Sequence, residues 1–286
     1  AEYMGNKDRA MADAVEGNGD YCIEEEIGRG RFGVVYRCTS RFKSEAVALK
    51  AIDKSTLTDS LDSQCLLSEP RILRHLPFHP YIIHLRGLFE TDSHLCIVTD
   101  LCSRGDLHSL ISSAGPLSEP ITKPIFIQTM LAIAHCHRHG VVHRDIKAEN
   151  ILIDSVGNAK LADFGSAETI HGGALHDVVG TPLYVAPEIL KGCGYNEKVD
   201  VWSAGVLLYA MVAGYFPFRG DDTGMIFEAV LRGNVRFPRR SFCMLSLSLN
   251  DLLWKMLCKD PSRRLSAHQV LGKPLFVITN SRPLAL

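Results

Sequence analysis

The chain has 286 residues, with 31 lysines and arginines against 32 aspartates and glutamates, so its formal net charge is −1. A nearly neutral chain has no overall electrostatic attraction to nucleic acid or to an acidic membrane surface, and we expect neither as a partner. With 46% hydrophobic and 22% charged residues, the chain can bury a large core and is not an intrinsically disordered protein.

The pattern of cysteines and the length of the apolar runs indicate the cellular compartment in which the protein is expected. Nine cysteines are scattered along the chain, without a C-x-x-C pair or a His/Cys cluster at zinc spacing. Such thiols are typical of a reducing compartment. No apolar run reaches the about 18 to 20 residues that span a bilayer, and no signal peptide pattern stands at the start. We therefore expect a soluble, monomeric protein of the cytoplasm.

The N-terminal part is predicted to be rich in strands. Residues 1–19 are polar and without periodicity, which indicates a tail. Strand signals begin at Tyr21, and the short apolar runs 34–36 and 46–49 predict two strands. A helix is predicted over residues 61–76, where Pro70 should kink it or remove one backbone hydrogen bond. Residues 94–98 predict another strand.

The C-terminal part is predicted to be helical from about Leu107. The amphipathic segment 125–139 ends before Gly140, a natural helix stop. Residues 201–211 are almost wholly apolar, which suits a helix that is buried on all sides. The fold class predicted from these patterns is α+β, with a small strand-rich part followed by a larger helical part.

A glycine-rich segment stands between the first two predicted strands, with the sequence Gly28-Arg29-Gly30-Arg31-Phe32-Gly33. In a dinucleotide-binding fold such glycines open a helix, whereas here Val34 and Val35 continue into a strand, so the segment is predicted to be a hairpin. Glycine lacks a Cβ and lets the backbone N–H groups approach phosphates. By itself the motif fits an ordinary glycine-rich turn equally well.

Lys50 ends an apolar strand, where its charge is costly unless it finds an anion. Glu69, on the predicted helix, is the candidate partner. Together the two residues could hold a nucleotide phosphate, although each alone is more often a surface charge.

The strongest motifs are His143-Arg144-Asp145-Ile146-Lys147-Ala148-Glu149-Asn150, then Asp163-Phe164-Gly165 and Ala186-Pro187-Glu188. Their order and spacing resemble the eukaryotic protein kinase signature. The segments 22–33, 163–168, 178–182 and 226–230 are further similar to the plant phosphoenolpyruvate carboxylase kinase family, minimal kinases related to the calcium- and calmodulin-dependent group.

The resemblance covers about residues 21–276 and implies a bilobal kinase. It places the small lobe at residues 20–99, the hinge at 100–106, the large lobe at 107–279 and a short tail at 280–286. The implied activity is transfer of the ATP γ-phosphate to a protein serine, with Mg²⁺ as the metal and phosphoenolpyruvate carboxylase as the target.

Catalytic roles follow from the resemblance, because positioning and charge neutralisation supply most of the rate of phosphoryl transfer. Asp145 is expected to orient the substrate hydroxyl and accept its proton, and Lys147 to neutralise the moving phosphoryl group. Asn150 and Asp163 are expected to hold magnesium, which prefers oxygen ligands. Lys147 two residues after Asp145, and Thr181 at the substrate side, resemble serine/threonine rather than tyrosine kinases.

The resemblance also assigns a nucleotide site. Lys50 is expected on the α- and β-phosphates, Thr99 as the gatekeeper, and Asp106 on the ribose. Backbone groups of Asp100 and Cys102 would meet adenine between Val35, Ala48 and Leu152, three residues that fit a plain core equally well without the resemblance. The full set is Ile27, Gly28, Arg29, Gly30, Arg31, Phe32, Gly33, Val34, Val35, Ala48, Lys50, Glu69, Thr99, Asp100, Cys102, Asp106 and Leu152.

Arg144 matches the arginine that pairs with an activation-loop phosphate in many kinases. The usual phosphothreonine position falls on Asp177, and no serine or threonine lies between Ile170 and Gly180. We hypothesise that Asp177 gives Arg144 a permanent negative partner, weaker than a phosphate with its charge of about −1.5 to −2. The alternative is that Asp177 is a solvated loop residue.

Asp106 and Glu149 match positions that receive a basic residue three before the target serine or threonine. Leu183 and Ala210 stand where selection of a second basic residue would need carboxylates. The sequence therefore predicts a preference for arginine or lysine at minus three and little preference at minus two.

Two departures weaken the assignment of the carboxylase as target. Ala148 replaces the usual proline, and Lys273-Pro274-Leu275 stands where the family has His-Pro-Trp.

No D-x-[DN]-x-[DN]-G calcium loop occurs and the chain ends soon after the kinase region, so activity independent of calcium is expected. The alternatives are a calcium-dependent-type kinase with another basic substrate, and a pseudokinase scaffold, which would be expected to lack Lys50, Asp145 or Asp163.

Overall fold

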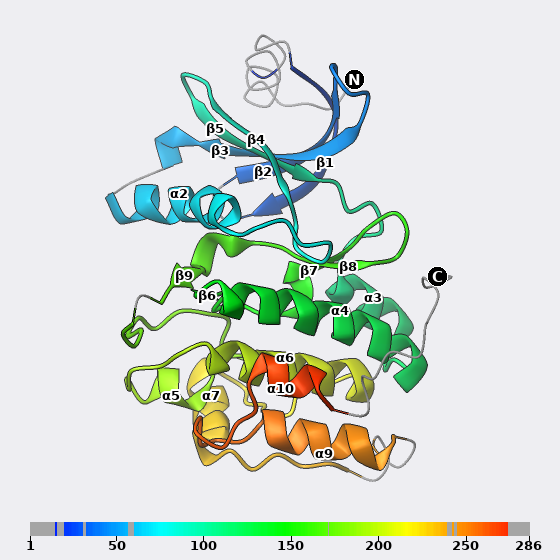
Figure 1. Ribbon diagram of the computed structural model, residues 1–286, viewed down its shortest axis with the longest axis vertical. Coiled ribbons are helices and arrows are strands. Elements are labelled where there is room, and N and C mark those ends of the chain that lie inside the picture. Colours follow the sequence, from blue (N-terminus) through cyan, green and yellow to red (C-terminus); the bar gives the residue numbers. More distant parts are fainter. Residues whose placement is uncertain are drawn as a thin grey trace. The chain divides into compact units, whose positions relative to one another are not determined.

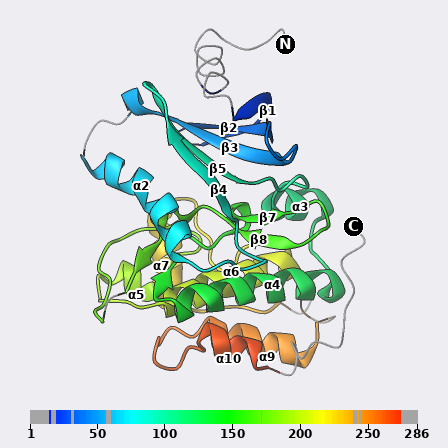
Figure 2. The same cartoon turned by 45° about the horizontal axis from the view of Figure 1, so that its top comes forward.

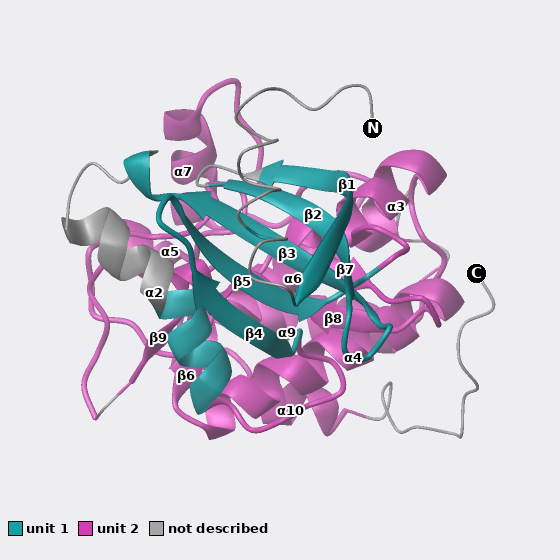
Figure 3. Ribbon diagram, turned by 90° about the horizontal axis from the view of Figure 1, so that it is seen from above, with its two compact units in different colours: residues 1–75, 83–102 teal, residues 76–82, 103–286 magenta. Residues whose placement is uncertain are grey.

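The computed structural model describes residues 15, 20–30, 33–56, 60–170, 172–238, 242 and 245–273, without the side chains of residues 30, 56 and 60–67. The chain forms two compact units, unit 1 with residues 1–75 and 83–102, and unit 2 with residues 76–82 and 103–286 (Figure 3). The division thus follows Cys102, inside the predicted hinge, and a short segment before it belongs to unit 2. The expected tails lie outside the described residues, apart from Val15.

Unit 1 is an antiparallel sheet with the strand order β1-β2-β3-β5-β4 (Figure 1). Its strands are β1 (Tyr21–Gly30), β2 (Gly33–Ser40), β3 (Ala46–Asp53), β4 (Leu85–Glu90) and β5 (His94–Asp100). A 3-10 turn, η1 (Lys54–Thr56), and the helix α2 (Ser60–His75) connect β3 to β4, and α2 packs against β4.

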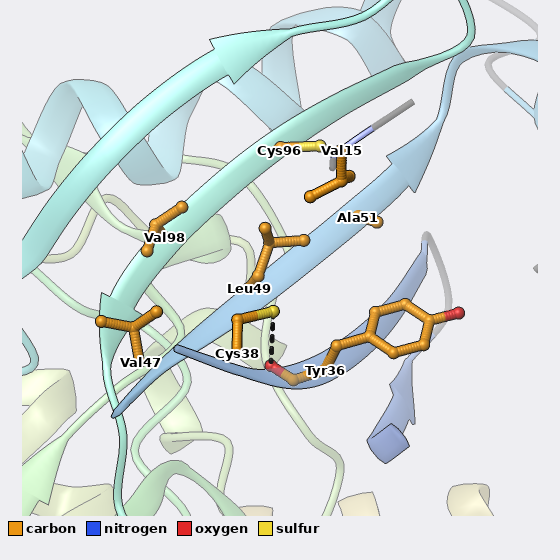
Figure 4. Close-up of a cluster of buried hydrophobic side chains, with 8 residues drawn as sticks. All are labelled: Val15, Tyr36, Cys38, Val47, Leu49, Ala51, Cys96 and Val98. Atoms are coloured by element: carbon orange, nitrogen blue, oxygen red, sulfur yellow. Dashed lines mark hydrogen bonds between the residues drawn. The ribbon is translucent and has the colours of Figure 1, made fainter. Parts of the chain in front are cut away.

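Alternation along β3 gives the sheet two different faces. Val47, Leu49 and Ala51 point to one face and are buried with Tyr36 of β2 and other side chains (Figure 4). That cluster is completed by Val15, Cys38, Cys96 and Val98. On the opposite face Ile52 and Ile97 are buried with Leu85, Leu88 and Leu95 packed against them. The period of two in a strand therefore leaves Ala48 and Lys50 on the face of Ile52.

Unit 2 is built around α6 (Lys198–Ala213), in which every residue from Val199 to Ala213 is buried. This helix packs against α4 (Glu119–Arg138) and α9 (Leu247–Met256), and α10 (Ala267–Leu271) packs against α4 (Figure 2). Shorter helices are α3 (Leu107–Ala114), α5 (Pro187–Leu190) and α7 (Thr223–Arg232). No helix among the described residues is long and apolar enough to cross a membrane.

Two small two-stranded sheets carry the loops of unit 2. β6 (Val141–Val142) pairs with β9 (Glu168–Thr169), and β7 (Ile151–Ile153) pairs with β8 (Ala159–Leu161). The 3-10 turn η2 (Ala148–Asn150) leads into β7, and η3 (Phe164–Ser166) follows β8. These short elements hold the motifs that the sequence singled out.

The predicted α+β class is confirmed. The wholly apolar segment is a buried helix as expected, and the predicted helix with Pro70 is observed as α2, which continues through the proline. The amphipathic helix starts earlier than predicted, because Ser118 stands at its N-cap and Pro120 in its first turn, where proline is tolerated. No strand was predicted at β4, in which Gly87 accompanies an irregular register.

A buried ion pair links α5 to the chain just before α10. The guanidinium of Arg264 donates to both carboxylate oxygens of Glu188, with N–O distances of 2.6 and 2.9 Å. The Arg264 side chain is fully buried, lies over the ring of Trp202, and also donates to the carbonyl oxygens of Cys258 and Lys198. Removal of one partner would leave a buried charge without compensation.

We predict that Arg264→Leu lowers the free energy of unfolding by about 3–5 kcal/mol, measured by urea denaturation. The matched control is Arg232→Leu, which removes an exposed helix pair with Glu228 and should change stability by at most about 0.5 kcal/mol. Equal losses in the two variants would contradict the prediction.

Three histidine rings stack in unit 2. His79 lies with its ring centroid 4.6 Å from that of His135, which lies 4.4 Å from that of His139. The His135 ring contacts the carbonyl oxygen of Pro77 at 3.0 Å. Burial, with the nearby His135, Arg138 and Lys160, lowers the pKa of His79 to about 4. Burial also lowers the pKa of His135, with His139 and Arg138 adding to the effect.

Because the pKa of His79 is lower in the folded than in the unfolded chain, the unfolded chain binds more protons between pH 6.5 and 4. The stability contributed by neutral His79 is therefore present above pH 6.5 and is lost as the pH falls toward 4. We predict that His79→Asn, whose amide oxygen can still accept from the Tyr81 N–H, has a shallower pH dependence of urea unfolding in this window than the parent protein. The exposed His176→Asn is the control that should retain the parent slope; a parent-like slope in His79→Asn would refute the prediction.

Candidate active site

Lys50 and Glu69 meet within unit 1. The Lys50 ammonium lies 2.8 Å from Oε2 of Glu69, and the Glu69 side chain is nearly buried. The strand β3 fixes the lysine backbone and the C-terminal half of α2 fixes the glutamate. A charge-assisted hydrogen bond of this kind orients the ammonium group more tightly than solvent would.

The register of the sheet brings other predicted nucleotide residues to the same face as Lys50. Val35 lies opposite Lys50, and Ala48 lies opposite Thr99. Gly28 lies opposite Val35. Because directly opposed residues share a face, these five positions form one continuous patch on the sheet.

The remaining predicted residues of unit 1 fall elsewhere. Val34 packs against the core cluster on the opposite face, so its side chain does not belong to this patch. The guanidinium of Arg29 donates to both carboxylate oxygens of Glu26 on the surface, and Ile27 is exposed. Gly30 is placed by its backbone pairing with Gly33, while Arg31 and Phe32 lie outside the described residues.

Gly33 is required by a close backbone approach. A Cβ at this position would lie 2.1 Å from the carbonyl oxygen of Ala51, so any side chain would force β2 and β3 apart. The hairpin between Gly30 and Gly33 can keep its register only with glycine there.

The end of β5 offers backbone groups. The N–H of Asp100 donates to the carbonyl oxygen of His84, and the Asp100 carbonyl oxygen accepts a long hydrogen bond of 3.5 Å from the Thr99 hydroxyl. The Asp100 side chain contacts Arg86 at 2.6 Å. Cys102, half-buried, ends this unit.

Residues 143–150 of unit 2, the expected catalytic loop, are held in place by α6. The buried carboxylate of Asp200 accepts the backbone N–H of His143 at 2.9 Å and that of Arg144 at 2.8 Å. It also contacts the His137 ring at 2.9 Å. Burial alone would raise the pKa of Asp200, but the hydrogen bonds and the electrostatic effect of His137 and His143 outweigh burial and lower it.

Asp145 is the centre of a polar cluster. Its Oδ2 accepts from the Lys147 ammonium at 2.6 Å, and its Oδ1 accepts from the Thr181 hydroxyl at 2.8 Å. The Thr181 hydroxyl in turn accepts from Lys147 at 3.1 Å. Asn150 donates to the Asp145 backbone carbonyl at 2.8 Å and to Oδ2 at 3.3 Å. Two donors of the same loop and one from the distant Thr181 therefore orient this carboxylate.

Asn150 and Asp163 lie at the same end of the β7–β8 hairpin. Ile151 pairs with Leu161, and the Ala162 N–H donates to the Asn150 carbonyl oxygen at 2.9 Å, directly before Asp163. The hairpin thus brings an amide oxygen and a carboxylate to one edge. Oxygen donors of this kind suit magnesium, which commonly takes one or two protein ligands and completes its shell with phosphates and water. No cluster of three or more histidine, cysteine or acidic side chains able to hold a metal occurs in the described part of the chain.

Two residues of these motifs hold a left-handed backbone. Asp163 has φ of 59° and Arg144 has φ of 68°, a region that residues other than glycine seldom adopt. The Asp163 turn is supported by its own carboxylate, which accepts the Gly165 N–H, while the buried ring of Phe164 packs edge-on against His143. Arg144 is supported by Asp200.

Arg144 and Asp177 contact each other. Nη1 of Arg144 lies 3.3 Å from Oδ2 of Asp177, and Nε donates to the Ser166 carbonyl oxygen at 2.6 Å. The Arg144 side chain is nearly buried, whereas the Asp177 side chain is 74% exposed. The pair is therefore open to solvent on one side.

Asp106, Leu152 and Glu149 lie close together in unit 2. Asp106 and Leu152 form an antiparallel bridge, and Glu149 lies on the adjoining turn, 3.8 Å from His108. The Asp106 carboxylate accepts the Ser109 N–H at 2.7 Å and so caps α3. Asp106 therefore has a second, structural role at the N-terminus of α3, which was not predicted.

Comparison with known proteins agrees with this arrangement of motifs. Residues 21–276 match the family described as protein kinase domain. The chain belongs to the protein kinase family. It is 41% identical over 266 residues to serine/threonine-protein kinase PEPKR2 of Arabidopsis thaliana, covering 93% of this chain and 55% of that protein. It is 38% identical over 268 residues to calcium-dependent protein kinase 4 of Arabidopsis thaliana, covering 92% and 53%.

The domain is thus similar to those of plant serine/threonine kinases, calcium-dependent ones among them, and the predicted enzyme class, a protein serine/threonine kinase, is confirmed. A protein kinase domain uses ATP with a divalent metal, generally Mg²⁺. The chain spans about half the length of the curated relatives it matches.

Three contacts of the kinase motifs involve residues that sequence reasoning left out. His137 contacts Asp200, and Tyr195 contacts both Arg144 and Asp177. A buried partner such as His137 could have been suspected, because Asp200 is an acid in the first turn of a helix that is otherwise apolar and buried. Nothing in the sequence pointed to Tyr195, which stands 51 residues after Arg144.

We predict that Asp106→Ala lowers the free energy of unfolding by about 1 kcal/mol, because α3 loses its cap, whereas Asp106→Asn largely retains it. Thermal or urea unfolding measures both. Equal stability of the alanine variant and the parent would mean that the cap contributes nothing.

Proposed function

We propose that the kinase domain transfers the ATP γ-phosphate to a protein serine or threonine that follows a basic residue. The observation that carries the proposal is the carboxylate of Asp145, whose Oδ2 accepts from Lys147 and Asn150 and whose Oδ1 accepts from Thr181. A carboxylate held in this way can orient a hydroxyl group, and Lys147 beside it can face developing negative charge.

In the proposed reaction the substrate hydroxyl oxygen attacks the γ-phosphorus. The bond to the β-phosphate oxygen breaks, ADP leaves, and the hydroxyl proton passes to Asp145. Lys147 stabilises the charge on the transferring group, and Lys50, fixed by Glu69, holds the α- and β-phosphates. Asn150 and Asp163 hold magnesium, which when bound neutralises phosphate charge.

In the proposed nucleotide site, Val35, Ala48 and Thr99 meet the adenine end through the sheet face they share with Lys50. The carbonyl of Asp100 and the backbone of Cys102 are the proposed hydrogen-bonding groups. For Leu152 and Asp106 the family resemblance implies contacts with the adenine ring and with the ribose, and we propose these roles for them. The glycine-rich hairpin, residues 28–33, covers the phosphates with backbone N–H groups.

For the peptide we propose that Glu149 and Asp106 select arginine or lysine at minus three. Both carboxylates belong to neighbouring segments of unit 2, since α3 packs against η2. Thr181, which bonds Asp145, marks the place of the target hydroxyl. Leu183 and Ala210 provide no carboxylate for a basic residue at minus two.

We further propose phosphoenolpyruvate carboxylase as the physiological substrate, supported by the family resemblance of the segments 22–33, 163–168 and 226–230. Activity without calcium is proposed for these 286 residues, in which no segment has the spacing of a calcium loop. We also propose that the protein acts in the cytoplasm as a monomer, in keeping with its balanced charge and scattered cysteines.

The test uses radiolabelled ATP with purified phosphoenolpyruvate carboxylase, and with peptides carrying arginine or alanine at minus three. We expect label on the carboxylase and on the arginine peptide, unchanged by a calcium chelator. Asp163→Asn should lower kcat by a hundredfold or more, on the order of the loss when a transition-state contact is removed. Phosphate transfer by Asp163→Asn at the parent rate would overturn the proposal. Absence of any transfer by the parent protein would also overturn it and would favour a pseudokinase scaffold.

Substrate selection is tested with Asp106→Asn and Glu149→Gln, which remove charge while retaining shape. Each should lower kcat/KM for the arginine peptide by about tenfold, the scale of one lost charged hydrogen bond, and leave the alanine peptide nearly unchanged. Transfer to another protein but not to the carboxylase would favour a different basic substrate, and loss of activity with chelator would favour a calcium-dependent kinase.

A further inference from the structure

Tyr195 lies between α5 and α6 and is joined to the loop 172–180 by its backbone. Its N–H donates to the carbonyl oxygen of Leu175 and its carbonyl oxygen accepts the Leu175 N–H, both at 2.9 Å. This antiparallel bridge ties the loop that follows the Asp163-Phe164-Gly165 turn to the base of unit 2. The bridge contains no charged group and is independent of the ion pair of Arg144.

The side chain of Tyr195 adds a second tie. Its hydroxyl donates to the carbonyl oxygen of Asp177 at 2.8 Å and accepts from Nη1 of Arg144 at 3.4 Å. Tyr195 is only 4% exposed, and burial raises its pKa, so the hydroxyl keeps its proton and remains a donor. One buried hydroxyl thus meets the loop and the arginine that stands next to Asp145.

A third observation comes from Gly194. A Cβ on this residue would lie 2.7 Å from the Cβ of Ala174 and 3.0 Å from Cε1 of His176. The loop therefore packs against the backbone of residue 194 at a distance that only glycine permits. The residues before and after Leu175, Ala174 and His176, thus both lie close to Gly194.

The relative exposure of these contacts decides which one holds the loop. The Asp177 carboxylate is 74% exposed, so water and salt screen its attraction to Arg144. The hydroxyl of Tyr195 is buried, where a hydrogen bond left unmade is not replaced by water. The backbone carbonyl of Asp177, rather than its carboxylate, is the better anchored group.

We infer that Tyr195 is a positioning residue that latches the loop 172–180 against the catalytic loop through Arg144, without a phosphorylated side chain. The inference rests on the proposed kinase reaction, because the latched loop leads directly to Thr181 and its contact with Asp145. The latch acts by its hydroxyl and its backbone bridge, and Asp177 contributes mainly through its main chain.

The experiment compares Tyr195→Phe with Tyr209→Phe. Tyr209 is equally buried and its hydroxyl donates to the carbonyl oxygen of Arg236 at 2.7 Å, so the control loses the same kind of bond elsewhere in unit 2. Steady-state kinetics should show about a three- to tenfold lower kcat for Tyr195→Phe, with the KM for ATP unchanged. Tyr209→Phe should keep the parent kcat, and Asp177→Asn should lose less than Tyr195→Phe.

Hydrogen exchange provides a readout that does not depend on catalysis. Amides of residues 172–180 should exchange faster in Tyr195→Phe and in Gly194→Ala than in the parent, while those of α7 should not change. Parent-like exchange and kcat in Tyr195→Phe, or equal effects in Tyr209→Phe, would overturn the latch. A parent protein that transfers no phosphate but shows the exchange difference would instead refute the proposed function alone.

Discussion

The carboxylate of Asp200 is the constraint on which the catalytic part of unit 2 depends. It lies inside the fully buried helix α6 and accepts two consecutive backbone N–H groups, those of His143 and Arg144. A buried carboxylate without partners would be very costly, so the helix can hold it only if the loop above it adopts one conformation. That conformation includes the left-handed backbone of Arg144, which in turn directs Asp145 toward Lys147, Thr181 and Asn150.

Ion pairs of similar length differ in how far they are buried, and therefore in how firmly the fold determines their geometry. Glu188 with Arg264 and Lys50 with Glu69 are close pairs whose acidic partners are nearly enclosed, so their geometry is fixed by the fold. Arg232 with Glu228 is as short but open to water. The pair of Arg144 with Asp177 is intermediate, enclosed on the arginine side alone. The site is therefore organised by hydrogen bonds to backbone groups at least as much as by charge.

Much of the fold could be predicted because the patterns are local. The apolar run 201–211, the strand alternation of β3 and the glycines of the first hairpin each determine one element. The ordered motifs from His143 to Glu188 further predicted the enzyme class. The sequence did not predict β4, since Gly87 interrupts its alternation, or the cap that Asp106 provides to α3. It could not predict the contacts of Tyr195, because a bond between residues 51 positions apart leaves no periodic trace.

Each unit contains buried cysteines whose reaction with a thiol reagent can report the opening of that unit. Cys38 and Cys96 are enclosed in the core of unit 1 (Figure 4). Cys136 in α4 is enclosed in unit 2. Burial raises the pKa of Cys96 to about 12 and raises that of Cys136 also, so neither forms the thiolate that alkylating reagents need. Once accessible cysteines have been blocked, each of these sulfurs becomes reactive only when its surroundings open. The rate at which each buried cysteine is labelled therefore reports the opening of the unit that contains it. Comparison of the rates shows whether the two units unfold together or one after the other.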